Sequence, residues 1–228
     1  MPGRLPISIL VGLAACTWVL VLVVAGGEVD WWFARPFSFV VGVISVVLAC
    51  FDRWVWRWPG LRAAVRRPDL GGTYWGVIRS EWVNHETGLK PTPISAAVVI
   101  RQTYTALTVT VFTADSFSST IAAELSEEPD GRFSVAGLYR NEPRLSVQDG
   151  SRIHYGGLRL YLAGPDTRLH GSYWTDRDTK GEMEFTRVSA KRAADYVEAR
   201  GLAIQWGAGL SACEALGSAN RGRVQGGI

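Results

Sequence analysis

The chain has 228 residues, a formal net charge of +3 at pH 7 and 47% hydrophobic residues. Several arginines cluster between residues 53 and 67. Without them, the net charge is too low for the strongly basic profile of a polynucleotide-binding protein. The three cysteines, Cys16, Cys50 and Cys213, form no CxxC pair and none lies beside a histidine. We therefore expect no metal site and no disulfide framework.

Two apolar segments predict a transmembrane hairpin over residues 1–56. The first runs from Ile7 to Ala25 without a charge, and about 19 residues of helix suffice to cross a hydrocarbon core of ~30 Å. The second, Phe37 to Phe51, is short by itself, but flanking tryptophans extend it to the interfaces, where Trp side chains prefer to lie. A cleaved secretory signal peptide, ending near Gly26, is the alternative for the first segment.

Charge predicts the orientation of this hairpin. The linker from Gly26 to Pro36 contains two acidic residues and one arginine, whereas the second segment is followed by Arg53, Arg57, Arg62, Arg66 and Arg67. An excess of arginine in short loops marks the cytoplasmic side. We therefore expect a multi-pass membrane protein with a periplasmic or extracellular loop, both termini in the cytoplasm, and a basic linker at residues 57–68 that contacts lipid phosphates.

Residues 69–188 alternate between apolar and polar side chains and are interrupted by Gly, Pro, Asn and Asp, a pattern typical of antiparallel strands. About eight strands are expected, at Thr73–Trp82, Ile94–Gln102, Ala106–Thr113, Phe117–Leu125, Arg132–Tyr139, Leu158–Ala163, Leu169–Thr175 and Glu182–Val188. Tight turns without helical crossovers leave a sandwich or an up-and-down barrel. We favour a cytoplasmic barrel, because closure removes the two exposed edges.

Residues 189–228 predict a short helix followed by a disordered tail. The amphipathic helix is expected at Ala190–Leu202, on the barrel or at the membrane. The remainder is rich in Gly, Ala and Ser and predicts no structure.

The sequence gives little support for catalysis. It contains no P-loop, no GxSxG and no HExxH motif, and His85, His154 and His170 are interpreted as solvated or structural. We therefore expect no catalytic residue, no enzyme activity and no cofactor. A ligand-binding module fits better, because a barrel of this strand number encloses room for one compact ligand.

Several polar and aromatic side chains suit a nucleotide. Alternation along residues 169–177 groups Tyr173, Thr175 and Arg177 on one face. A ring can stack on a base, a hydroxyl can bind its edge, and a guanidinium can hold phosphate. Ser118 and Asn141 lie in polar segments at strand ends. The alternative interpretation is that these are ordinary polar side chains on the protein surface with no role in ligand binding.

Two segments carry a family resemblance. Asp69-Leu70-Gly71-Gly72-Thr73-Tyr74-Trp75-Gly76 with Ser80 is similar to a D-L-x-G-x-W-x-G-x-x-x-S motif, with Tyr74 where Trp is usual. Residues 171–181 are similar to a closing G-x-Y-x-T-x-R-x-T-x-G hairpin. The chain thereby resembles the two-transmembrane β-barrel effectors of cyclic-oligonucleotide-based anti-phage signalling (CBASS), the SMODS-associated or CD-NTase-associated proteins.

The resemblance implies that one chain both binds the signalling molecule and damages the membrane. Its barrel would bind a cyclic di- or trinucleotide, and the protein would form a homo-oligomer that disrupts inner-membrane lipids and kills the infected cell. The ligand site is then expected to use Tyr74 or Trp75 and Tyr173 for stacking, Arg177 for phosphate, and Ser118, Ser119, Asn141 and Thr175 for the base edge. Two alternatives stay open: a protein-docking scaffold with a filled interior, and a lipid-modifying enzyme with a histidine or carboxylate in a pocket.

Overall fold

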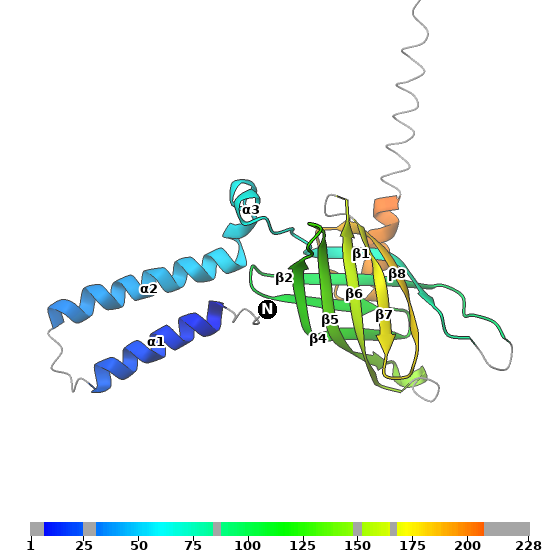
Figure 1. The fold of residues 1–228 in the computed structure, drawn as a ribbon, viewed down its shortest axis with the longest axis horizontal. Helices are drawn as coiled ribbons and strands as arrows, with labels where there is room; N and C mark the ends of the chain where they lie inside the picture. Colours follow the sequence, from blue (N-terminus) through cyan, green and yellow to red (C-terminus); the bar gives the residue numbers. More distant parts are fainter. Residues whose placement is uncertain (1–6, 25–30, 84–87, 148–151, 165–167, 208–228) are drawn as a thin grey trace, which may run out of the picture. The chain divides into compact units, whose positions relative to one another are not determined.

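The computed structural model describes residues 7–24, 31–83, 88–147, 152–164 and 168–207. The chain divides into two compact units. The first spans Met1–Asp69 together with Gln102–Ala106, and the second spans Leu70–Arg101 together with Leu107–Ile228. Figure 1 shows helices in the first unit and a barrel in the second.

The first unit contains α1 (Ile7–Val24), α2 (Trp31–Arg53), the 3-10 turn η1 (Val55–Arg57) and α3 (Pro59–Val65). The predicted transmembrane hairpin is wrong: within the described residues, no helix is both long enough and apolar enough to cross a membrane. The 18 residues of α1 rise only about 27 Å, short of a ~30 Å core. The 23 residues of α2 include two arginines, a proline and an aspartate. The predicted periplasmic loop at residues 25–30 lies outside the described residues.

Side chains near the end of α2 organise the rest of the first unit. Asp52 Oδ1 accepts hydrogen bonds from the Thr105 backbone N–H at 2.9 Å and from the Thr105 hydroxyl at 2.8 Å. The Phe51 ring meets Tyr104 edge to face at a centroid distance of 5.1 Å. Trp56 is fully buried. These contacts hold the 102–106 segment against the helical part of this unit.

The second unit is a closed antiparallel barrel in which each strand pairs with the next and β8 pairs back with β1. The predicted barrel is therefore present. Its strands are β1 (Gly72–Ser80), β2 (Ile94–Gln102), β3 (Leu107–Phe112), β4 (Ser116–Glu127), β5 (Phe133–Pro143), β6 (His154–Ala163), β7 (Arg168–Thr175) and β8 (Lys180–Ser189).

The outer face of β2 is covered by the C-terminal segment. Residues 196–207 are helical, and Ala199 packs with Ala97 and Val99 in a buried cluster. The hydroxyl of Thr73 donates to the Lys191 carbonyl at 2.7 Å and accepts from the Ala193 backbone N–H at 2.9 Å. These two bonds keep residues 191–193 out of a helix, so the helix begins later than predicted. The predicted tail at residues 208–228 lies outside the described residues.

The seam between β1 and β8 depends on a glycine. Gly76 pairs with Phe185 in the antiparallel register, and a Cβ at Gly76 would lie 1.8 Å from the carbonyl oxygen of Glu184. No real Cβ tolerates such a contact, so any larger residue would force the two strands apart. Gly76 is also the second glycine of the barrel-opening motif found in the sequence, and the close approach of β1 and β8 explains why glycine stands there.

We predict that Gly76→Ala destabilises the barrel by on the order of 1–3 kcal/mol, as expected for overpacking against a backbone that cannot move freely. Gly60→Ala in α3 is the control, because a Cβ there meets nothing within 4 Å and alanine favours a helix. Thermal unfolding followed by circular dichroism should show a lower melting temperature only for Gly76→Ala. Equal melting temperatures would contradict this account of the seam.

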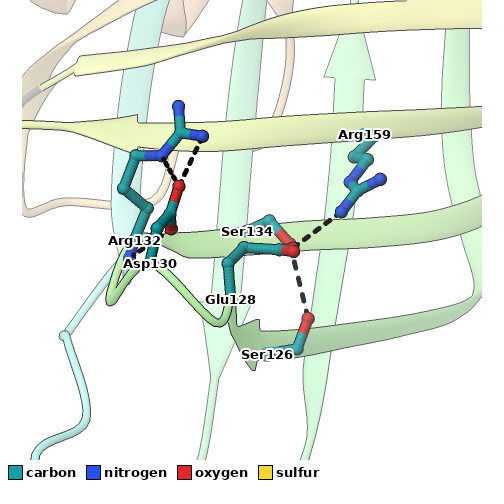
Figure 2. A network of polar contacts seen from close by, with 6 residues as sticks. All are labelled: Ser126, Glu128, Asp130, Arg132, Ser134 and Arg159. Carbon is teal, nitrogen blue, oxygen red and sulfur yellow. Dashed lines mark hydrogen bonds and ion pairs between the residues drawn. The ribbon is translucent and has the colours of Figure 1, made fainter.

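The hairpin between β4 and β5 is held by a polar network (Figure 2). Glu128 accepts hydrogen bonds from the Ser134 hydroxyl and, at 2.8 Å, from the Arg159 guanidinium. Asp130 binds Arg132 at 2.7 Å. The hydrogen bond from Ser134, followed by that from Arg159, lowers the pKa of Glu128 below its ordinary value of 4.5. The ionised carboxylate is thus the form that the folded hairpin favours.

Because the pKa of Glu128 is lower in the folded than in the unfolded chain, its contribution to stability is present at neutral pH and is lost as the pH falls through the folded pKa. Glu128→Gln should therefore lower the melting temperature at pH 7, and the difference from the parent protein should vanish in acid. Glu124→Gln, at an exposed position of β4, should change little at either pH. If the melting temperatures of the parent and Glu128→Gln still differed in acid, the stabilising role of the ionised Glu128 carboxylate would be contradicted.

Candidate functional site

The barrel interior is filled at one end and hollow at the other. Buried side chains such as Leu70, Tyr74, Ile100 and Leu107 fill the end where β1 begins. At the opposite end, a partly open cavity of about 200 Å³ lies among side chains of β1 to β8 and the turns that follow β3 and β7. The described residues that line it are Ile78, Ile94, Val111, Thr113, Ser118, Tyr139, Asn141, His154, Leu158, Tyr173, Thr175, Thr179 and Met183.

One wall of the cavity is a network of small polar side chains from β4, β5 and the turn after β3. The Asn141 amide donates to the Ser118 hydroxyl at 2.8 Å and to the Ser116 hydroxyl at 3.2 Å. The Ser116 hydroxyl in turn lies 3.0 Å from that of Thr113. Asn141 and Ser118 are buried. Since both amide N–H groups are engaged, the amide oxygen of Asn141 is left as an acceptor.

A second wall is aromatic and carries hydroxyl donors. Tyr139 and Tyr173 both line the cavity, and within the described part of the chain neither phenol has a hydrogen-bond partner. Burial, with smaller contributions from Tyr173 and Asp176, raises the pKa of Tyr139 well above its ordinary value. Its hydroxyl therefore stays protonated near neutral pH and can donate a hydrogen bond to a ligand.

The rim of the cavity is formed in part by the turn between β7 and β8. The hydroxyls of Thr175 and Thr179 lie 2.6 Å apart across this turn, and the Arg177 backbone N–H donates to Thr175 Oγ1 at 3.2 Å. The Arg177 side chain is exposed and its guanidinium donates to the carbonyl oxygen of Arg152. Thr175 and Thr179 thus fix the turn that carries Arg177.

His154 lines the cavity on the side formed by β6. Its Nδ1 lies 3.1 Å from the carbonyl oxygen of Arg152, which can only accept, so the neutral ring carries its proton on Nδ1. Nε2 is then the nitrogen that can accept a hydrogen bond.

The structure brings four of the eight sequence-predicted site residues together, namely Ser118, Asn141, Tyr173 and Thr175. The other four lie outside the cavity lining. Tyr74 is buried in the filled end and donates to the Leu70 carbonyl at 3.1 Å, while Trp75 lies 5.4 Å from the Tyr196 ring on the outer face. Ser119 faces away from Ser118 by strand alternation, and Arg177 belongs to the rim turn.

Sequence reasoning did not assign four polar lining residues to the site: Thr113, Tyr139, His154 and Thr179. A signal for Tyr139 existed, because it lies two residues before Asn141 and therefore shares its face in a strand. Thr179 belongs to the hairpin motif that supplied Tyr173 and Thr175. Thr113 and His154 lie at strand margins, where alternation gives no orientation.

Comparison with known proteins adds a family match. Residues 65–187 match the model described as Cap15, cyclic dinucleotide receptor domain. CD-NTase-associated protein 15 from Staphylococcus schleiferi is 24% identical over 151 residues, which cover 66% of this chain and 78% of that protein. The family match includes every described residue that lines the cavity.

Proposed function

We propose that this chain, which belongs to the family of Cap15 cyclic dinucleotide receptor domains, is a CBASS effector that binds a cyclic oligonucleotide at the open end of its barrel. The family match confirms the resemblance that the two sequence motifs indicated. The main support for this site is the cavity at one end of the barrel. Its lining combines two phenol rings with a buried amide and hydroxyls.

The lining supplies the chemistry that a nucleotide needs. Tyr139 and Tyr173 offer faces for a base, and Ser118 and Asn141 offer a donor and an acceptor for its edge. The phosphates would then lie at the rim, where Arg177 is exposed in the β7–β8 turn and can hold an oxygen pair bidentately.

Binding fits this cavity better than the two alternatives. A docking scaffold would have a filled interior, whereas about 200 Å³ of this barrel is hollow. A hydrolytic enzyme would need a nucleophile and base held together. Of the described lining residues, His154 is the one with a conventional base, and none is a carboxylate. We infer that the chain is a receptor and not an enzyme.

We predict that removing a ring or the rim cation weakens ligand binding. Tyr173→Leu should lower affinity about tenfold or more, since stacking of a base on an aromatic side chain contributes roughly 1–3 kcal/mol. Arg177→Ala should lower affinity and reduce its salt dependence, because a phosphate contact is lost. Isothermal titration of the full chain with a panel of cyclic di- and trinucleotides measures both effects.

Matched controls come from the same barrel. Trp75→Leu removes a ring from the outer face of β1, and Arg168→Ala removes an exposed arginine from the other end of β7. Neither should change affinity by more than about twofold. The receptor proposal is refuted if the parent protein binds no member of the panel.

We further propose that ligand binding leads to self-association and to damage of the inner membrane. Support comes from the family resemblance and from the helices of the first unit. Large apolar side chains of α1 and α2 are between 45% and 77% exposed, namely Val19, Leu20, Val23, Val24, Val43, Ile44, Val46 and Val47. Apolar surface of this extent needs a lipid or protein partner.

We expect the full chain to release a trapped dye from vesicles of phosphatidylethanolamine and phosphatidylglycerol only when an activating cyclic nucleotide is added. Tyr173→Leu should need a correspondingly higher ligand concentration, because its defect is in binding. Light scattering of the same samples reports self-association. Dye release that is independent of ligand, or absent at saturating ligand, would argue against this effector step.

A further inference from the structure

The size of the cavity limits what can enter it. Its volume is about 200 Å³, and an apolar cavity of roughly 150 Å³ is already filled by one benzene ring. A cyclic dinucleotide has two bases, two riboses and two phosphates, and pockets that enclose ligands of such size measure roughly 300–1,000 Å³. The cavity has room for one nucleobase but not for the whole ligand.

The charge of the lining excludes the phosphates. None of the described residues that line the cavity is a lysine or arginine. An ionised phosphate moved into this space would lose water without gaining an ion-pair partner, which is a large cost. A neutral base has no such penalty, and the apolar walls formed by Leu158 and Met183 favour its burial.

The polar groups that are left unpaired suit the edge of a single base. The amide oxygen of Asn141 can accept, because both amide N–H groups donate to serines. The hydroxyl of Ser118 accepts from that amide and keeps its own proton to donate. Each nucleobase presents neighbouring donors and acceptors of this kind along one edge.

We infer that the cavity takes one nucleobase of the cyclic dinucleotide and reads its edge through Asn141 and Ser118, while the second base and both phosphates stay outside the barrel. This inference rests on the proposed receptor function. Its consequence for specificity is that one of the two bases decides affinity and the other is tolerated. A site built around buried polar groups rejects a base that leaves them unpaired.

The test compares ligands with identical and mixed bases. The full chain is titrated with the cyclic dinucleotides that combine A, G and U in all six ways. A mixed ligand that carries the favoured base should bind within about threefold of the ligand that carries it twice, since it loses only one of two equivalent orientations. Ligands without that base should bind at least about tenfold more weakly. Mixed ligands of intermediate affinity, or equal affinity across the panel, would overturn the inference.

A pair of neighbouring substitutions tests the same point on the protein. Ser118→Leu fills the cavity, whereas Ser119→Leu places the same side chain on the other face of β4. Ser118→Leu should reduce affinity for the best ligand at least about tenfold, and Ser119→Leu should not. Unchanged affinity in a folded Ser118→Leu variant, checked by its melting curve, would overturn the inference.

The two proposals fail in different ways. Lack of binding to every cyclic nucleotide refutes the receptor function. Binding that reads both bases, or that survives a filled cavity, refutes the one-base inference and leaves the receptor function in place. If Ser118→Leu does not fold, the comparison of mixed and identical ligands decides the matter without any variant.

Discussion

Closure of the sheet between β1 and β8 is the constraint on which the rest of this molecule depends. An eight-strand sheet left open would have two exposed edges and no interior. Here β1 and β8 pair from Thr73 with Ser189 to Ser80 with Gly181, and Gly76 allows the two backbones to approach. Closure turns the inner faces of all eight strands toward one another, so that residues far apart in sequence surround one space.

Large inner side chains fill one end of the barrel interior as a core, and small ones leave the cavity at the other end. Tyr74, Ile100 and Phe185 fill the end where β1 begins, and their apolar burial stabilises the barrel. At the other end the inner positions of β4 and β7 and of the turn after β3 hold small residues, including Ser118, Thr175 and Thr113, which leave a hollow. These polar groups satisfy part of their hydrogen bonding with one another, which limits the cost of burying them.

The sequence predicted the strand content well because alternation and turn chemistry are local properties. The antiparallel barrel and the approximate strand positions followed from them, and the closing hairpin motif supplied Tyr173 and Thr175. The transmembrane hairpin was predicted from apolar content over windows of residues. The helices in the structure do not have the boundaries of the predicted apolar segments. Helix α1 has 18 residues, and the 23 residues of α2 include charged residues and a proline.

The amino-acid sequence by itself determined the family and the antiparallel strands, and it predicted residue types that suit a nucleotide. Only the tertiary structure decided which of those residues meet. Tyr74 and Trp75 are equivalent as rings in the sequence, yet one is buried in the filled end and the other contacts Tyr196 outside. Ser118 and Asn141 are 23 residues apart and become partners through the register of β4 and β5. Register and closure are set by contacts distant along the chain, so no local pattern of side chains contains them.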